Sequence, residues 1–193
     1  MGCSLVITLA AFFVAGFFVS VARGSEAKIL LESVDNKTIC KLNQDILANI
    51  SELQGPIRVI AAVGNARVGK STTLNLISHI WNGKNETSAV EEIFKTGHSH
   101  NAVTCNVWAH IIKPKYETGG NIVLLDVEGT DLGDDRVTDR LSTFTAMMSS
   151  VLNVFALNIV GNSDIGFLYR IARLSDLMFK DKKYVQPNFP KLS

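Results

Sequence analysis

The sequence has few of the residues that define several protein classes. Its 193 residues include only three cysteines and four histidines, and its net charge is +1. The cysteines, Cys3, Cys40 and Cys105, lie far apart, so a disulfide pair and buried free thiols both remain open. The histidines lack metal-ligand spacing. A charge this small gives no electrostatic basis for binding nucleic acid, so we expect no nucleic-acid partner.

Charge is also missing from one long stretch at the N-terminus, residues 4–22. Ala22 and Gly24 are small residues at the positions that a signal peptidase reads, so residues 1–24 are expected to form a signal peptide cleaved before Ser25. In that case the protein enters the secretory pathway or is secreted.

The same apolar run is also long enough to span a bilayer. Positive charge follows it, at Arg23 and Lys28, which favours an uncleaved anchor that keeps residues 25–193 in the cytosol. Membrane association through this segment follows from the anchor interpretation. Three N-x-[ST] sequons, at Asn36, Asn49 and Asn85, can carry glycans only in the secretory case, so they test the topology.

The phosphate-binding pattern G-x-x-x-x-G-K-[ST] is present as GNARVGKS, from Gly64 to Ser71. In such a loop the backbone N–H groups turn inward around phosphates, the lysine reaches the β and γ oxygens, and the hydroxyl joins a Mg²⁺ shell. We therefore predict that the whole loop and the residue after it bind a nucleotide. These residues are Gly64, Asn65, Ala66, Arg67, Val68, Gly69, Lys70, Ser71 and Thr72.

The residues on either side of this loop support the prediction. Residues 57–63 are mostly apolar and partly β-branched, as in a buried strand, and residues 72–77 begin a helix with leucines at helical spacing. A strand that leads through a glycine loop into a helix N-terminus forms an anion site.

A second motif, Asp126-Val127-Glu128-Gly129, follows an apolar strand expected over residues 121–125. A carboxylate at the end of a strand parallel to the phosphate-loop strand can hold Mg²⁺ through water, and Gly129 can offer its N–H to a γ-phosphate. We therefore predict that Asp126 and Gly129 complete the nucleotide site. His98 and His100, in a polar stretch upstream, are expected to be solvated rather than metal ligands.

Further patterns predict alternating strands and helices. An edge strand is expected over residues 28–31, and further strands over residues 57–63, 103–112, 121–125 and 154–160. Helices are expected over residues 42–53, 72–77, 138–152 and 165–179. Residues 117–120 are expected to form a hairpin turn. This alternation predicts an α/β fold, a P-loop three-layer sandwich with a mainly parallel sheet and helices on both faces.

These motifs together resemble the G domain of the guanylate-binding protein and atlastin family, within the dynamin-like large GTPases. The resemblance covers roughly residues 27–192 and rests on GNARVGKS, FKTGHSHNAVTCNVW, LLDVEGTD and the run from Leu141 to Ile165. Ordinary small GTPases lack both an arginine inside the phosphate loop and the D-x-E-G form. The resemblance implies a protein that binds GTP with Mg²⁺ and hydrolyses it to GDP and phosphate.

The resemblance also implies roles for single residues. Ser71, Thr104 and Asp126 would hold Mg²⁺, with Thr104 matching the switch I threonine that closes on the γ-phosphate. Asp126, Glu128 and Gly129 match switch II, so Glu128 is also expected at the nucleotide site. Arg67, Lys70 and Thr104 would be catalytic, because Arg67 matches the arginine that the family uses in cis on transition-state charge, a task that suits a planar, permanently charged guanidinium. Alternatively, Arg67 points to solvent or pairs with an acidic partner chain. A nucleotide-dependent homodimer is also expected.

Two departures from the family pattern bear on function. Ala102 stands where guanylate-binding proteins have a serine that helps orient the attacking water, which predicts slow hydrolysis or another way to hold the water. The family reads guanine through an Arg-Asp pair at the end of a strand that should begin after Pro190, and the sequence stops at Ser193. The C-terminal strand or strands of the sheet are therefore expected to be missing.

Two other functions remain open at this stage. One is a non-catalytic, nucleotide-dependent interaction module or inactive fragment, which Ala102 and the missing base site favour. The other is an ATP-using P-loop protein, which the phosphate loop alone does not distinguish from a GTPase.

Overall fold

The computed structural model describes residues 4–7, 26–34, 39–85, 87–96, 106–113, 120–128, 135–157 and 162–179. Its elements alternate strands with helices along the chain. In order they are β1 (Ser4–Ile7), β2 (Lys28–Val34), β3 (Ile39–Leu42), α1 (Gln44–Ser51), β4 (Ile57–Gly64), α2 (Lys70–Trp81), β5 (Asn106–Ile112), β6 (Asn121–Val127), α3 (Asp135–Met148), β7 (Val151–Leu157) and α4 (Asn162–Phe179).

The strands form one sheet in the order β1-β7-β4-β6-β5-β2-β3. The parallel pairs are β4 with β6 and β4 with β7, whereas β5, β2, β3 and β1 pair antiparallel with their neighbours. Parallel strands need a crossover connection, and α3 supplies one between β6 and β7, which flank β4, while a direct turn suffices between the antiparallel neighbours β5 and β6. The expected parallel pairing is therefore found in the adjacent strands β7, β4 and β6, and the expected pairing of β5 with β6 is confirmed.

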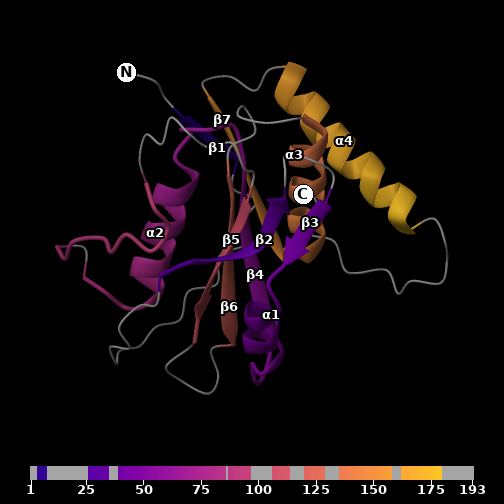
Figure 1. Cartoon of the computed structure of the whole chain (residues 1–193). Helices are drawn as coiled ribbons and strands as arrows, with labels where there is room; N and C mark the ends of the chain where they lie inside the picture. Colours follow the sequence, from indigo (N-terminus) through magenta and orange to yellow (C-terminus); the bar gives the residue numbers. More distant parts are fainter. Residues whose placement is uncertain are drawn as a thin grey trace.

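Three layers result, as Figure 1 shows, with α2 on one face of the sheet and α3 and α4 on the other. Ala61 and Val63 of β4 belong to the apolar cluster that includes residues of α1, α3 and α4. Ala62, between them, belongs to the cluster under α2. Because the second half of β4 is buried on both faces, its sequence from Val59 to Val63 is a continuous apolar run rather than an alternating one. The expected three-layer α/β fold is confirmed.

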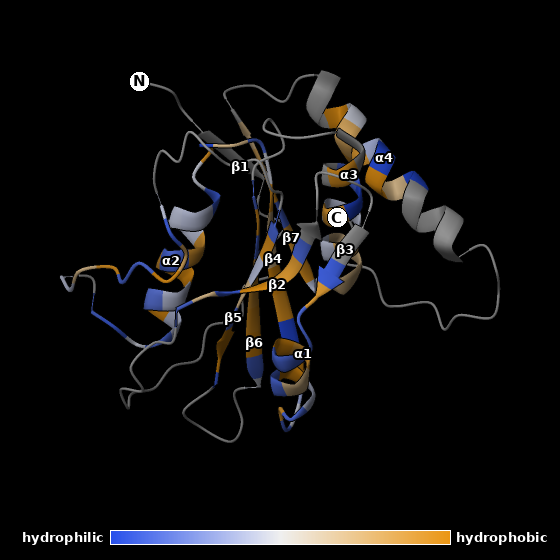
Figure 2. Ribbon diagram, in the orientation of Figure 1, coloured by the Kyte–Doolittle hydropathy of each residue, from blue (hydrophilic) through white to orange (hydrophobic). Residues whose placement is uncertain are grey.

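Apolar residues gather along the central strands and on the sides of the helices that meet them (Figure 2). Ile122 and Leu124 of β6 lie in the cluster under α2, and Val123 and Leu125 lie in the cluster on the opposite face. This strict alternation fixes the register of β6, since a slip of one residue would exchange its two buried faces.

Some element boundaries differ from the sequence prediction. Leu42 was expected to begin the helix over residues 42–53, but it ends β3, and α1 begins at Gln44. Val151 and Leu152 were expected to end the helix over residues 138–152, but α3 ends at Met148 and both residues belong to β7. The backbone N–H of Ser150 donates to the carbonyl of Val59 (2.7 Å), and the N–H of Val59 donates to the Ser150 hydroxyl (3.1 Å). Pairing with β4 therefore begins at Ser150 and overrides the helical spacing of the apolar residues.

The predicted leader is described only over Ser4–Ile7, which forms the edge strand β1 and pairs with β7. Its assignment as a cleaved signal peptide or an anchor stays a prediction. Among the helices of the described residues, none combines the length and the apolar character that a bilayer span requires. The strand expected at residues 28–31 is found as β2, but its expected place at the edge of the sheet is wrong, because β2 pairs with β5 on one side and with β3 on the other.

Candidate nucleotide-binding site

The phosphate loop begins where β4 comes closest to β7. Gly64 has φ 134°, and a Cβ at this position would lie 2.1 Å from the carbonyl oxygen of Phe155. Only glycine allows this approach, so the end of β4 and the start of the loop are fixed against the neighbouring parallel strand.

The middle of the loop has an unusual backbone conformation. Arg67 has φ 61°, the left-handed region that a non-glycine residue rarely adopts, and its side chain is exposed. Such conformations cost about 1 kcal/mol or more and occur often at ligand sites. The buried side chain of Val68 packs into the apolar cluster under α2, so Val68 can offer a ligand only its backbone.

The loop ends at the N-terminus of α2, where Gly69 is the N-cap with φ 93°. No side chain caps this helix end, and its first turn has no acidic residue. By contrast, the Asn43 side chain accepts the N–H groups of Asp45 and Ile46 at the start of α1. A helix N-terminus without a capping side chain has backbone donors and a positive dipole end available for an anion.

Lys70 extends back over the loop from the first turn of α2. Its Nζ donates to the carbonyl oxygens of Gly64 (3.0 Å) and Asn65 (2.6 Å), and the residue is 6% exposed. The ammonium group is therefore buried within the loop that the sequence predicted would hold phosphates.

Ser71 and Asp126, which are 55 positions apart in the sequence, meet beside the loop. The Ser71 hydroxyl donates to Oδ2 of Asp126 at 2.5 Å. This contact arises because β4 and β6 are parallel and Asp126 is paired with Ala62, two residues before the loop. The sequence prediction that a carboxylate would follow a strand parallel to the phosphate-loop strand is confirmed.

The Asp126 carboxyl is 6% exposed, and its Oδ1 finds no hydrogen-bond partner among the described residues. Burial raises its pKa from the usual 3.8 to about 6, although the Ser71 hydroxyl and the Lys70 ammonium act in the opposite direction. A buried carboxylate oxygen without a partner beside a serine hydroxyl fits Mg²⁺, which prefers oxygen ligands and keeps several waters. Ser71 and Asp126 are therefore suitable metal ligands.

Glu128 connects the end of β6 to the start of β5. Its carboxylate accepts the Trp108 indole N–H at 2.7 Å, and its backbone N–H donates to the Asn106 carbonyl at 3.0 Å. Burial raises the pKa of this half-buried carboxyl, while the hydrogen bonds from Trp108 and Asn106 lower it. The Glu128 side chain therefore points to β5 rather than into the phosphate loop.

The structure thus brings Lys70, Ser71 and Asp126 together at the loop. The remaining loop residues that were predicted, Asn65 and Ala66, follow Gly64 directly, and Thr72 lies exposed on the first turn of α2. Several predicted positions lie outside the described residues. They are Thr104, Gly129, Ala102, His98 and His100. Within the described part, no group of three or more His, Cys, Asp or Glu side chains is placed to hold a metal ion.

The family model for the guanylate-binding protein N-terminal domain matches residues 37–188 of this chain. The chain belongs to the guanylate-binding protein family. It is 28% identical to guanylate-binding protein 5 of Homo sapiens over 159 residues and 24% identical to guanylate-binding protein 1 of Mus musculus over 157 residues, and each match covers 80% of this chain. The chain spans about a quarter of the length of these curated relatives.

Two polar residues near the site were not singled out from the sequence. Asn75 lies on the buried side of α2 and Trp108 on β5, and each makes hydrogen bonds to another segment of the chain. An asparagine among leucines at buried helical positions is a signal that could have revealed Asn75. Trp108 gave no such signal, because an aromatic residue in a strand is usually explained by packing.

Proposed function

We propose that this chain binds GTP together with Mg²⁺ and hydrolyses it to GDP and phosphate. The observation that carries the proposal is the contact between Ser71 and Asp126 beside the buried Lys70 ammonium. These three groups are the hydroxyl, the carboxylate and the cation that phosphoryl transfer in P-loop proteins requires. The membership of the guanylate-binding protein family supports guanine nucleotide as the ligand.

Each group would have a separate task in hydrolysis. Lys70 would balance charge on the β and γ oxygens, and the exposed guanidinium of Arg67, on the same loop, would stabilise charge that develops on the leaving group. Ser71 and Asp126, with Thr104 as the third ligand, would hold Mg²⁺, which when bound neutralises phosphate charge. Water would attack the γ-phosphorus, and the backbone N–H of Gly129 would contact the γ-phosphate.

Equilibrium binding of fluorescent GTP and ATP analogues with Mg²⁺ tests the first half of this proposal. The folded full chain is expected to bind GTP in the micromolar range and to prefer it to ATP. A folded chain that binds neither nucleotide would contradict the proposal, while equal affinity for both would favour a P-loop protein without guanine selectivity.

The alternative function is a nucleotide-dependent interaction module without turnover, and the observation that favours it is Ala102 in place of the family's serine. Single-turnover phosphate release at saturating GTP separates the two functions. Release that depends on Arg67 supports the enzyme, whereas tight binding without release supports the module. Light scattering with GDP and with a non-hydrolysable GTP analogue tests the expected nucleotide-dependent homodimer.

The topology of residues 1–24 also has a direct test. Asn49 on α1 and Asn85 after α2 are exposed, so both sequons are accessible to a glycosylating enzyme, while Asn36 lies outside the described residues. If the leader is cleaved in the secretory pathway, glycosidase treatment is expected to shift the mobility of the protein. The shift should vanish when all three asparagines are changed to glutamine. An unshifted wild type would favour the cytosolic anchor.

A further inference from the structure

Asn75 makes three hydrogen bonds from the buried side of α2 to one short piece of backbone. Its Nδ2 donates to the carbonyl of Phe94 (2.9 Å), and its Oδ1 accepts the N–H groups of Phe94 (2.8 Å) and Ile93 (3.2 Å). The residue is 4% exposed. The amide therefore pairs with both backbone groups of Phe94, much as a neighbouring strand would.

Other contacts hold the same two residues from different sides. The N–H of Ala27 donates to the carbonyl of Ile93 (3.1 Å), and the Phe94 ring meets the His110 ring edge to face, with centroids 6.3 Å apart. Phe94 is 2% exposed and lies in the apolar cluster under α2. Ile93 and Phe94 are thus fixed relative to α2, β2 and β5 together.

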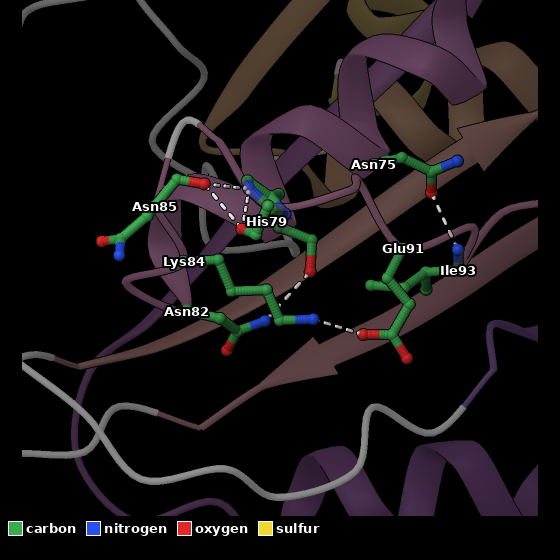
Figure 3. A network of polar contacts seen from close by, with 9 residues as sticks. Asn75, His79, Asn82, Lys84, Asn85, Glu91 and Ile93 are labelled. Atoms are coloured by element: carbon green, nitrogen blue, oxygen red, sulfur yellow. Dashed lines mark hydrogen bonds and ion pairs between the residues drawn. The ribbon is translucent and has the colours of Figure 1, made fainter.

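The last turns of α2 hold the chain that leads to Ile93. His79 Nε2 lies 3.1 Å from the Asn85 carbonyl, and the Ser88 hydroxyl donates to that same carbonyl (2.6 Å). Lys84 and Glu91 form an ion pair of 2.6 Å across the segment. Figure 3 shows Asn75 directed at Ile93 and His79 at Asn85, both from α2. The helix is thereby bound at two positions one turn apart, Asn75 and His79, to the segment that leads to Phe94.

This arrangement links the nucleotide site to a second part of the chain. Asn75 follows Ser71 by four residues, about one helical turn, so a phosphate bound at the N-terminus of α2 and the backbone of Phe94 are held by the same rigid helix. The segment 97–105, which contains Thr104, begins three residues after Phe94. It is followed by Asn106, whose carbonyl accepts a hydrogen bond from the backbone N–H of Glu128. The residues that flank this segment are therefore held by α2 on one side and by Glu128, two residues after Asp126, on the other.

We propose that Asn75 is a positioning residue, which fixes Ile93 and Phe94 to the phosphate-binding helix and so sets where the chain enters the segment that carries Thr104. The inference rests on the proposed function. Thr104, by resemblance, contacts the γ-phosphate, so the expected consequence of losing Asn75 is a weaker preference for the triphosphate over the diphosphate. A side chain that merely satisfied buried backbone groups would affect both nucleotides equally.

The test measures dissociation constants of the full chain for fluorescent GDP and for a non-hydrolysable GTP analogue, both with Mg²⁺. Asn75→Asp keeps the shape and the two acceptor bonds but places an oxygen against the Phe94 carbonyl. Asn75→Ser removes the amide and is measured in parallel, so that the result does not depend on one substitution. Asn82→Asp is the matched control, since it makes the same change at an exposed position at the end of the same helix.

In both Asn75 variants the GDP dissociation constant is expected to stay within about twofold of wild type, while the preference for the triphosphate falls about tenfold. The Asn82 control variant should keep the dissociation constants for both nucleotides at their wild-type values. A folded Asn75 variant with unchanged preference, or with equal weakening of both nucleotides, would overturn the inference alone. A folded wild type that binds neither nucleotide would overturn the proposed function as well.

Discussion

The helices on the two faces of the sheet bury polar side chains in different ways. On α2, Asn75 and His79 bond to residues 85–94, a separate segment of the chain. On α3, the partner of the Thr143 hydroxyl among the described residues lies in the same helix, at the Asp139 carbonyl (2.6 Å). The hydroxyls of Ser142 and Thr145 find no partner among the described residues.

This difference indicates how precisely each helix is held. Hydrogen bonds depend on direction as well as distance, so they fix the rotation and the axial position of α2. Apolar packing of Leu141 and its neighbours stabilises α3 without specifying one direction. Phosphoryl transfer tolerates misplacement of its groups poorly. The helix that carries Lys70 and Ser71 bonds to a separate segment through buried side chains, whereas Asp139 of α3 forms its 2.7 Å ion pair with an exposed residue, Arg170 of α4.

The largest effect is expected from a cavity on the α3 side. Leu141 is fully buried, so Leu141→Ala should lower the free energy of unfolding by about 2–5 kcal/mol, measured by urea denaturation. The preference for triphosphate over diphosphate should not change in the folded fraction, because α3 does not hold Ile93 and Phe94. Leu76→Ala, on the exposed side of α2, is the matched control and should cost far less. A changed nucleotide preference in the Leu141 variant would remove the functional distinction between the two faces.

The next largest effect should come from the phosphate loop itself. Lys70→Ala removes the buried ammonium, and the affinity for GTP is expected to fall about 100-fold, because hydrogen bonds from charged donors are the strong ones. Lys95→Ala removes the same charge from an exposed site and should leave the affinity unchanged. Titration of a fluorescent analogue measures both variants. An affinity within threefold of wild type in the Lys70 variant would argue against phosphate binding at this loop.

A third prediction concerns the charge buried at Asp126. Its folded-state pKa of about 6 exceeds the usual 3.8, so the folded chain binds this proton more tightly than the unfolded chain does. Stability without nucleotide should therefore fall as the pH rises from about 4 to about 6, by an amount on the order of 1–3 kcal/mol from this group. Asp126→Asn should remove this slope and raise the stability at pH 7, while it weakens Mg²⁺-dependent binding.

Thermal denaturation of wild type and the Asp126 variant at several pH values, with and without Mg²⁺ and nucleotide, measures both the pH dependence of stability and the Mg²⁺-dependent binding. Ser71→Ala is a useful companion variant, since it removes the hydroxyl and leaves the carboxylate in place. Equal pH slopes in wild type and the Asn variant would show that Asp126 is not the group that titrates.

The smallest effect is expected at the hydroxyls without partners on α3. Thr145→Val keeps the shape and removes a buried oxygen that has no partner, so it should be neutral or stabilise the chain by up to about 1 kcal/mol. Thr143→Val removes a hydroxyl that does make a hydrogen bond and should cost about 1 kcal/mol. Chemical denaturation of both variants checks the contrast. A clear loss of stability in the Thr145 variant would mean that its hydroxyl has a partner after all.

The sequence was sufficient to predict the elements around the phosphate loop. β4, the loop and α2 follow one another directly, and a glycine pattern with fixed spacing defines their geometry locally. The strand before Asp126 was also predicted, because an apolar run followed by D-x-x-G has local signals at both ends. The limits of α3 were less certain, since the start of β7 at Val151 depends on Ser150 pairing with Val59, 91 residues away.

The sequence by itself therefore determined the phosphate-loop pattern and the family of the domain, and it predicted Lys70, Ser71 and Asp126 as site residues, because each depends on local spacing. Only the tertiary structure decided that Ser71 meets Asp126, that Glu128 bonds to Trp108 and that Asn75 holds Phe94. Those contacts join residues that are 19 to 55 positions apart in the sequence and that belong to different segments of the chain. They exist because parallel strands align their ends and because a buried amide must find partners, conditions that no local pattern encodes.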